Sequence, residues 1–221
     1  MGLISDENRK IILKEFGEHL KDPVELKVYV DDDENCQYCA PTVEIVSELS
    51  SLDSRISLKV IKKGDARAEE AGDVPTKFPT VIVSDGKKLG SRVRFSGIPS
   101  GYEFSSLFED IKTVSSGNVQ VPDSVKEKIM SIDKPVDIKV YVTPTCPYCP
   151  RAVGTAHRFA MLNSNITGEM IEATEFPKEA SEAGVSSVPH IVINDDASFV
   201  GARPDADFAE FILDAVMSSP S

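Results

Sequence analysis

The chain has 221 residues, enough for one large domain or two small domains of about 100 residues each. Its net charge of −12 argues against nucleic-acid binding, because neutralising phosphates requires a basic surface. No apolar run approaches the ~18 residues that span a membrane, and the N-terminal segment MGLISDENRK is too polar for a signal peptide. We therefore expect a soluble, cytoplasmic protein with neither nucleic acid nor membrane as a partner.

The sequence of the first half predicts alternating helices and strands. Apolar residues recur at helical spacing in some segments and form short β-branched runs in others. In chain order the predicted elements are a helix from Ser5 or Asp6 to Leu20, a strand at 24–30, a helix after the first two cysteines, a strand at 56–61, a short helix, a strand within 78–83, a strand around 91–96 and a helix from Tyr102 to Thr113. The first helix has Ile11, Ile12, Phe16 and Leu20 on its apolar face. This order is typical of an α/β fold with a mixed sheet.

The second half of the chain repeats the first. The matched segments are LKVYV (26–30) with IKVYV (138–142), CQYC with CPYC, FPTVIV (78–83) with VPHIVI (188–193), and FSG (95–97) with FVG (199–201). Matches in the same order, at offsets of 104 to 112 residues, indicate an internal duplication. We predict two units, residues 1–116 and 117–221, with the linker SSGNVQVP at 115–122.

All four cysteines lie in the two Cx2C pairs, one in each unit. In each half the first cysteine follows a strand and lies where a helix begins, and Pro147 is predicted at the first helical position. Residues i and i+3 of a helical turn have Cα atoms roughly 5–5.5 Å apart, within the range for a disulfide. The helix dipole favours a thiolate at the first cysteine. We predict Cys146 and Cys36 as nucleophiles, with Cys149 and Cys39 as resolving thiols.

Two other interpretations of the cysteines are weaker. A disulfide that closes about four residues gains only about 2 kcal/mol, against nearly 5 kcal/mol for a loop of about 100 residues, so a structural cross-link is a poor explanation. A zinc site with four thiolates would bring together two pairs that are separated by 106 residues, and a metal cluster could also bridge two chains. We predict no bound metal and no cofactor.

The order of motifs resembles a known family. A strand, CPYC at the start of a helix, and a later VP or FP before a strand are similar to the thioredoxin/glutaredoxin family. Two such units, with CQYC first and CPYC second, resemble the archaeal and bacterial glutaredoxin-like protein disulfide oxidoreductases over essentially the whole chain. The resemblance implies two tandem thioredoxin-like units, each a central mixed sheet flanked by helices. It also implies that Pro79 and Pro189 are cis and lie against the cysteines, which turns the backbone of Phe78 and Val188 outward to pair with an extended substrate.

Other side chains near the motifs have two interpretations each. Tyr38 and Tyr148 stand between the cysteines, where they either pack beside the sulfurs or cover the surface. His190 follows Pro189 and matches Thr80 of the first half; it either moves protons near the sulfurs or is a strand residue.

The two cysteine pairs differ in the charge around them. Four acidic residues at 31–34 precede Cys36 and disfavour a nearby thiolate by like-charge repulsion. Neutral residues at 143–145 precede Cys146, and Arg151 follows within the next turn. We therefore expect the pair at Cys146 to be the more reactive, unless these charges point into solvent and are screened.

These features predict a thiol–disulfide oxidoreductase that reduces, oxidises or isomerises protein disulfides. Its expected partners are protein substrates with disulfides or thiols, a thioredoxin-reductase-like flavoprotein that resets it, and a peroxiredoxin as recipient. An alternative function is a dedicated electron carrier from such a flavoprotein to a peroxiredoxin. A more remote alternative is a non-catalytic four-cysteine zinc-binding or chaperone-like protein, although both cysteine pairs are intact.

Overall fold

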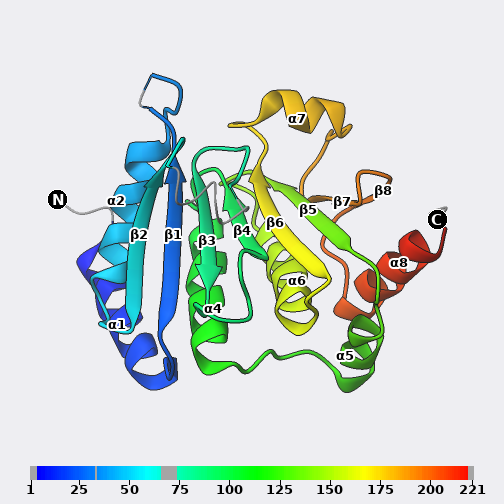
Figure 1. Cartoon of the computed structure of the whole chain (residues 1–221), viewed down its shortest axis with the longest axis horizontal. Helices are drawn as coiled ribbons and strands as arrows, with labels where there is room; N and C mark the ends of the chain where they lie inside the picture. Colours follow the sequence, from blue (N-terminus) through cyan, green and yellow to red (C-terminus); the bar gives the residue numbers. More distant parts are fainter. Residues whose placement is uncertain (1–3, 33, 66–73, 219–221) are drawn as a thin grey trace.

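One eight-stranded sheet runs through both halves of the chain (Figure 1). The computed structural model describes residues 4–32, 34–65 and 74–218. The strand order across the sheet is β2-β1-β3-β4-β6-β5-β7-β8. The strands are β1 (Val24–Val30), β2 (Ile56–Lys62), β3 (Thr80–Ser84), β4 (Val93–Ser96), β5 (Val136–Val142), β6 (Ile166–Glu172), β7 (His190–Ile193) and β8 (Ala197–Val200).

Helices cover the sheet. They are α1 (Asp6–His19), α2 (Cys39–Ser50), α4 (Glu103–Ser116), α5 (Asp123–Met130), α6 (Cys149–Leu162), α7 (Pro177–Glu182) and α8 (Asp205–Ser218). The short helix predicted after β2 lies largely outside the described residues. Within the described ranges, no helix combines the length and apolar character needed to cross a bilayer.

The first helix forms where the sequence predicts it, with one difference. The Ser5 hydroxyl accepts the backbone N–H of Asn8, which satisfies one free donor of the first turn. Phe16 is fully buried, but Ile11 is 55% exposed, so its predicted place on the buried face is wrong. The buried face is narrower than predicted and follows Ile12 and Phe16.

Each half forms the same four-stranded arrangement, which confirms the predicted fold class. In the first half β1 pairs parallel with β2 and antiparallel with β3, and β3 pairs antiparallel with β4. In the second half β5, β6, β7 and β8 pair in the same way. Apolar side chains that alternate along β1 and β5 face the helices α2 and α6, which carry the cysteines.

The two halves join through a parallel pairing of β4 with β6. Val93 lies opposite Gly168, and a Cβ built on Gly168 would come within 2.8 Å of the Ala156 carbonyl oxygen. A glycine is therefore needed where β6 meets α6 beside the junction. Nothing in the sequence pattern predicted that the two sheets would merge.

The connection between the halves begins later than predicted. Ser115 belongs to α4, and its buried hydroxyl donates to the Asp22 carbonyl and accepts the N–H of Lys21. These bonds hold the end of α4 against the chain before β1, and the helix ends with Gly117 in the left-handed conformation. The division into units at residue 116 stays a prediction.

Candidate active site

Each Cx2C pair forms a disulfide. The Cα atoms of Cys36 and Cys39 are 5.4 Å apart, and those of Cys146 and Cys149 are 5.5 Å apart, as predicted. All four cysteines are buried within the main hydrophobic core. In both pairs the N–H of the second cysteine points to the carbonyl of the first, at N···O distances of 3.2 and 3.4 Å. The geometry suits reversible closure, because little movement is needed between the two thiols.

The helices begin at the second cysteine of each pair, not at the first. Helix α6 starts at Cys149, so Pro147 lies in the preceding turn and its predicted place at the first helical position is wrong. Pro150 lies in the first helical turn instead, where its missing N–H costs nothing. The reason for the difference is that the chain between the cysteines forms a separate turn before the helix.

The proline before the third strand of each unit follows a cis peptide bond. These bonds are Phe78–Pro79 and Val188–Pro189, and they lie in equivalent positions of the repeat. The side chains of both preceding residues pack against the core that contains the cysteines. The cis geometry agrees with the resemblance noted above, and the role of these residues in substrate binding stays a prediction.

A glycine supports each cis proline from the next strand. The N–H groups of Gly97 and Gly201 donate to the carbonyls of Pro79 and Pro189, both at 2.8 Å. Both glycines have φ angles above +90°, a backbone conformation that other residues rarely adopt. Gly97, which follows β4, is therefore part of the first site, and Gly201, which follows β8, is part of the second site.

Three further predicted site residues lie at the surface. Tyr148 is 71% exposed and Tyr38 is 37% exposed, so both rings are accessible to a partner protein. Arg151 is exposed on the first turn of α6. The predicted roles of these three residues stay predictions.

His190 lies on β7 and is buried. Neither of its ring nitrogens has a hydrogen-bond partner among the described residues, and burial lowers its pKa. It lies opposite Tyr141 of β5, whose ring packs on the α7 side of the sheet, with the two ring centroids 6.4 Å apart. The cysteines belong to the core on the α6 side, so this position does not strengthen the predicted proton-transfer role.

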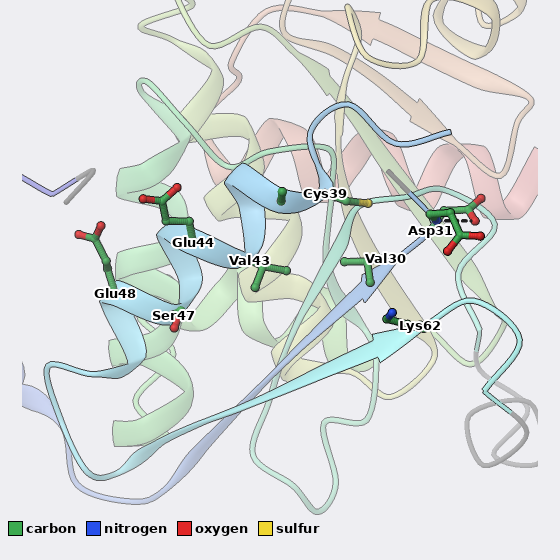
Figure 2. A pocket seen from close by; sticks show the side chains of 10 residues that line it. Val30, Asp31, Cys39, Val43, Glu44, Ser47, Glu48 and Lys62 are labelled. Atoms are coloured by element: carbon green, nitrogen blue, oxygen red, sulfur yellow. Dashed lines mark hydrogen bonds between the residues drawn. The ribbon is translucent and has the colours of Figure 1, made fainter. Parts of the chain in front are cut away.

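An acidic groove of about 640 Å³ lies beside the first pair (Figure 2). Cys39 lines it together with Asp31 and Asp32 at the end of β1 and with Glu44 and Glu48 of α2. Carboxylates around the groove disfavour a negative charge on nearby sulfur. This arrangement strengthens the expected difference between the pairs, although Asp33 of the acidic run lies outside the described residues.

Part of this acidic charge is neutralised. Lys63 lies 2.6 Å from Asp31 and holds the pKa of that carboxyl below its usual value. Arg9 lies 3.8 Å from Glu48. At the equivalent places of the second unit the sequence has Gly154 for Glu44 and a basic residue for Glu48. The positions in α6 that are equivalent to Glu44 and Glu48 therefore carry no carboxylate.

Glu103 is a buried acid that lies outside the Cx2C motifs. It begins α4, is 2% exposed, and accepts the Ser106 hydroxyl on one oxygen at 2.6 Å. Its other carboxylate oxygen has no partner among the described residues. Burial raises the pKa of Glu103 to about 7. A glutamate at the start of a predicted helix looks like an ordinary first-turn acid, so only the packing reveals it.

Replacing Glu103 with glutamine is expected to stabilise the fold in a pH-dependent way. Because the folded pKa lies above the ordinary value, wild-type stability is complete below pH 4.5 and falls as the pH rises through about 7. The variant should gain on the order of 3 kcal/mol over the wild type at about pH 8 and little at about pH 5. Urea unfolding at both pH values measures this, with the exposed Glu127→Gln as control. An equal gain at both pH values contradicts the prediction.

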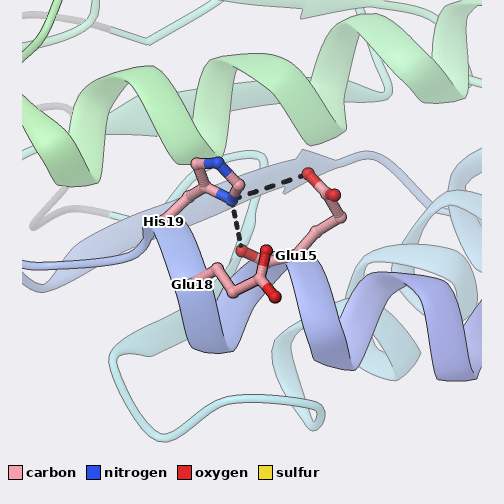
Figure 3. Close-up of side chains that lie close together, drawn as sticks. All are labelled: Glu15, Glu18 and His19. Carbon is pink, nitrogen blue, oxygen red and sulfur yellow. Dashed lines mark hydrogen bonds and ion pairs between the residues drawn. The ribbon is translucent and has the colours of Figure 1, made fainter.

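A group of possible metal ligands lies on α1 (Figure 3). Ligand atoms of Glu15, Glu18 and His19 lie within 4.8 Å of one another. However, Lys112 Nζ lies 2.9 Å from Glu15 and lowers the pKa of that carboxyl, and His19 Nδ1 is 3.0 Å from the Glu15 carbonyl oxygen. The group is better described as a surface ion-pair cluster.

Comparison with known proteins agrees with this geometry. Residues 136–214 match the Thioredoxin domain family. A protein disulfide oxidoreductase from Aeropyrum pernix K1 is 30% identical, and the alignment covers 99% of this chain and 96% of that one with a TM-score of 0.87. The chain belongs to the protein disulfide oxidoreductases.

The chain is also similar to part of longer proteins. The NTD_N/C domain of alkyl hydroperoxide reductase AhpF from Enterococcus faecalis is 27% identical, covers 94% of this chain and 99% of that one, and gives a TM-score of 0.85. The AhpF component of alkyl hydroperoxide reductase in Escherichia coli is 27% identical over 190 residues, which is 86% of this chain and 34% of that protein. The chain thus spans about a third of the length of the curated relatives it matches.

Proposed function

We propose that the chain is a thiol–disulfide oxidoreductase that acts on protein disulfides. The observation that carries this proposal is that both Cx2C pairs close as disulfides at the start of the helices α2 and α6. The 30% identity to a protein disulfide oxidoreductase supports it. The cytoplasm is the proposed compartment, because all four cysteines belong to redox-type pairs and none cross-links distant segments.

The proposed reaction is a sequence of two thiolate attacks. The Cys146 thiolate attacks one sulfur of a substrate disulfide, the substrate S–S bond breaks, and the other substrate sulfur leaves as a thiolate that takes up a proton. The Cys149 thiolate then attacks Cys146, which releases the second substrate sulfur and closes the Cys146–Cys149 disulfide. Two electrons pass to the substrate, so an external dithiol or a flavoprotein must reduce the pair again. Cys36 and Cys39 follow the same steps.

A turbidity assay of insulin reduction by dithiothreitol tests this proposal. The wild-type chain is expected to accelerate the reduction, and a variant with Cys36→Ser and Cys146→Ser is expected to show only the rate of dithiothreitol alone. Elemental analysis of the same samples separates the zinc-binding alternative. No acceleration by the wild-type chain, together with about one zinc per chain, would replace this proposal with a structural metal site.

The similarity to the AhpF component of alkyl hydroperoxide reductase favours a second candidate function. We propose as this alternative that the chain carries electrons from a thioredoxin-reductase-like flavoprotein to a peroxiredoxin, since the relative's name states that it is a subunit of a hydroperoxide reductase. The same insulin assay distinguishes the two when a purified thioredoxin-reductase-type flavoprotein and its nicotinamide nucleotide replace dithiothreitol. A dedicated carrier is reduced quickly by the flavoprotein but passes few electrons to insulin.

A further inference from the structure

The loop that follows β4 touches both cysteine sites. At its start the N–H of Gly97 donates to the carbonyl of cis-Pro79, and at its end the N–H of Tyr102 donates to the carbonyl of Pro144 at 3.0 Å. Pro144 belongs to the turn before the second pair, where the N–H of Cys146 donates to Thr143 at 3.1 Å. Residues 97–102 of the first unit therefore contact the backbone that leads into Cys146.

The contact with the second site requires a glycine. Gly101 has a φ of +60°, and a Cβ built on it would lie 2.2 Å from the Pro144 carbonyl oxygen. Both surfaces are backbone, so no flexible side chain can move aside, and the turn before Cys146 would have to shift. Gly117 has nearly the same φ, +65°, but a Cβ there meets nothing within 4 Å. The two glycines share a backbone conformation and differ in what they touch.

The internal repeat shows that this contact is not general to the fold. Gly97 and its counterpart Gly201 have φ angles of +96° and +93°, and both bond a cis proline carbonyl. A Cβ on Gly97 would lie 2.6 Å from Glu172 Cβ of the second unit, whereas a Cβ on Gly201 meets nothing within 4 Å. In addition, the N–H of Ile98 donates to Glu175 at 2.7 Å. The first loop is fitted to the other unit, and the second loop is not.

We propose that the first unit completes the second disulfide site, with Gly101 and the Tyr102 amide as positioning groups for Cys146. Close approach at Gly101 and the hydrogen bond from Tyr102 fix the turn from Thr143 to Cys146. The turn sets where the Cys146 sulfur lies relative to the start of α6, on which the stability of its thiolate depends. The importance of this arrangement for catalysis rests on the proposed function.

The test compares Gly101→Ala with Gly117→Ala in a chain that keeps only the second pair, through Cys36→Ser and Cys39→Ser. Both variants acquire the same left-handed strain, but only the first displaces Pro144. Alkylation of Cys146 by iodoacetamide is followed as a function of pH, with circular dichroism confirming the fold. Gly101→Ala is expected to shift the pH midpoint of Cys146 alkylation by about one unit. At a pH below the thiol pKa, a shift of that size changes the alkylation rate by about tenfold. Gly117→Ala is expected to leave both unchanged.

Equal alkylation profiles in the two folded variants would overturn the proposal, since a structural role alone lowers stability without moving the thiol pKa. If Gly101→Ala does not fold, the proposal is tested by the NMR resonance of the Tyr102 amide in the parent chain, which keeps only the second cysteine pair. It is expected to move when Cys146–Cys149 is reduced, while the Gly117 amide stays in place; a Tyr102 amide that does not move overturns the proposal. If the variants are alkylated as expected but the wild-type chain does not accelerate insulin reduction, the proposed function is refuted and this inference is retained.

Discussion

Replacing Cys146 with serine is expected to remove most of the acceleration of insulin reduction, whereas Cys36→Ser is expected to leave the greater part. The physical reason is the pKa of the attacking thiol, because nearby carboxylates disfavour its thiolate. Asp32 and Glu44 line the groove beside the first pair, and neither has a cationic partner among the described residues. Around the second pair, residues 143–145 are neutral.

The difference in reactivity between Cys146 and Cys36 depends on how strongly solvent screens the carboxylates beside the first pair. One unit of pKa separates the two thiolate populations by about tenfold at a pH below both values. Alkylation rates of Cys36 and Cys146, measured from mildly acidic to neutral pH in single-pair variants, give the difference directly. High salt should narrow it, because the Debye length falls to about 3 Å at 1 M. A Cys36 that reacts as fast as Cys146 at low salt would show that the electrostatic argument is wrong.

Replacing Asp110 or His157 with alanine is expected to lower the free energy of unfolding by about 3–5 kcal/mol, the usual cost of breaking a buried charged pair. Both side chains are buried where α4 packs on α6. His157 Nδ1 lies 2.5 Å from an Asp110 carboxylate oxygen, and Nε2 donates to the Arg94 carbonyl at 3.1 Å. Burial also raises the pKa of Asp110.

The internal repeat supplies matched controls for this prediction. Ser47 and Asp214 occupy the equivalent places in α2 and α8, and both are exposed. Alanine at either should change stability by no more than about 0.5 kcal/mol. Urea unfolding of the oxidised chain measures all four variants and the double variant of Asp110 and His157. Losses that simply add in the double variant would show that the two side chains do not act as a pair.

The sequence predicted each unit well because the information is local. The apolar residues of the matched segments at 26–30 and 138–142 identify both segments as core strands. The Cx2C spacing alone places two cysteines within disulfide reach. The cis geometry at Pro79 and Pro189 followed only from the family resemblance, since the residue types do not specify it.

What the sequence did not predict lies between the units. His157 has the spacing of an ordinary helix residue, and only the docking of α4 shows that it is buried against Asp110. The close approach at Gly101 depends in the same way on Pro144, which is 43 residues away in the chain. Contacts between the two units leave no periodic pattern in the sequence, because each residue fits the helix or loop pattern of its own unit.

The pairing of β4 with β6 joins unlike strands of the repeat. β6 is the counterpart of β2, and β4 is the counterpart of β8, so the units meet head to tail and no two-fold axis exchanges them. As a result α6, which carries the second pair, packs against α4 of the other unit. The mode of joining therefore gives two disulfides of the same local sequence pattern different surroundings.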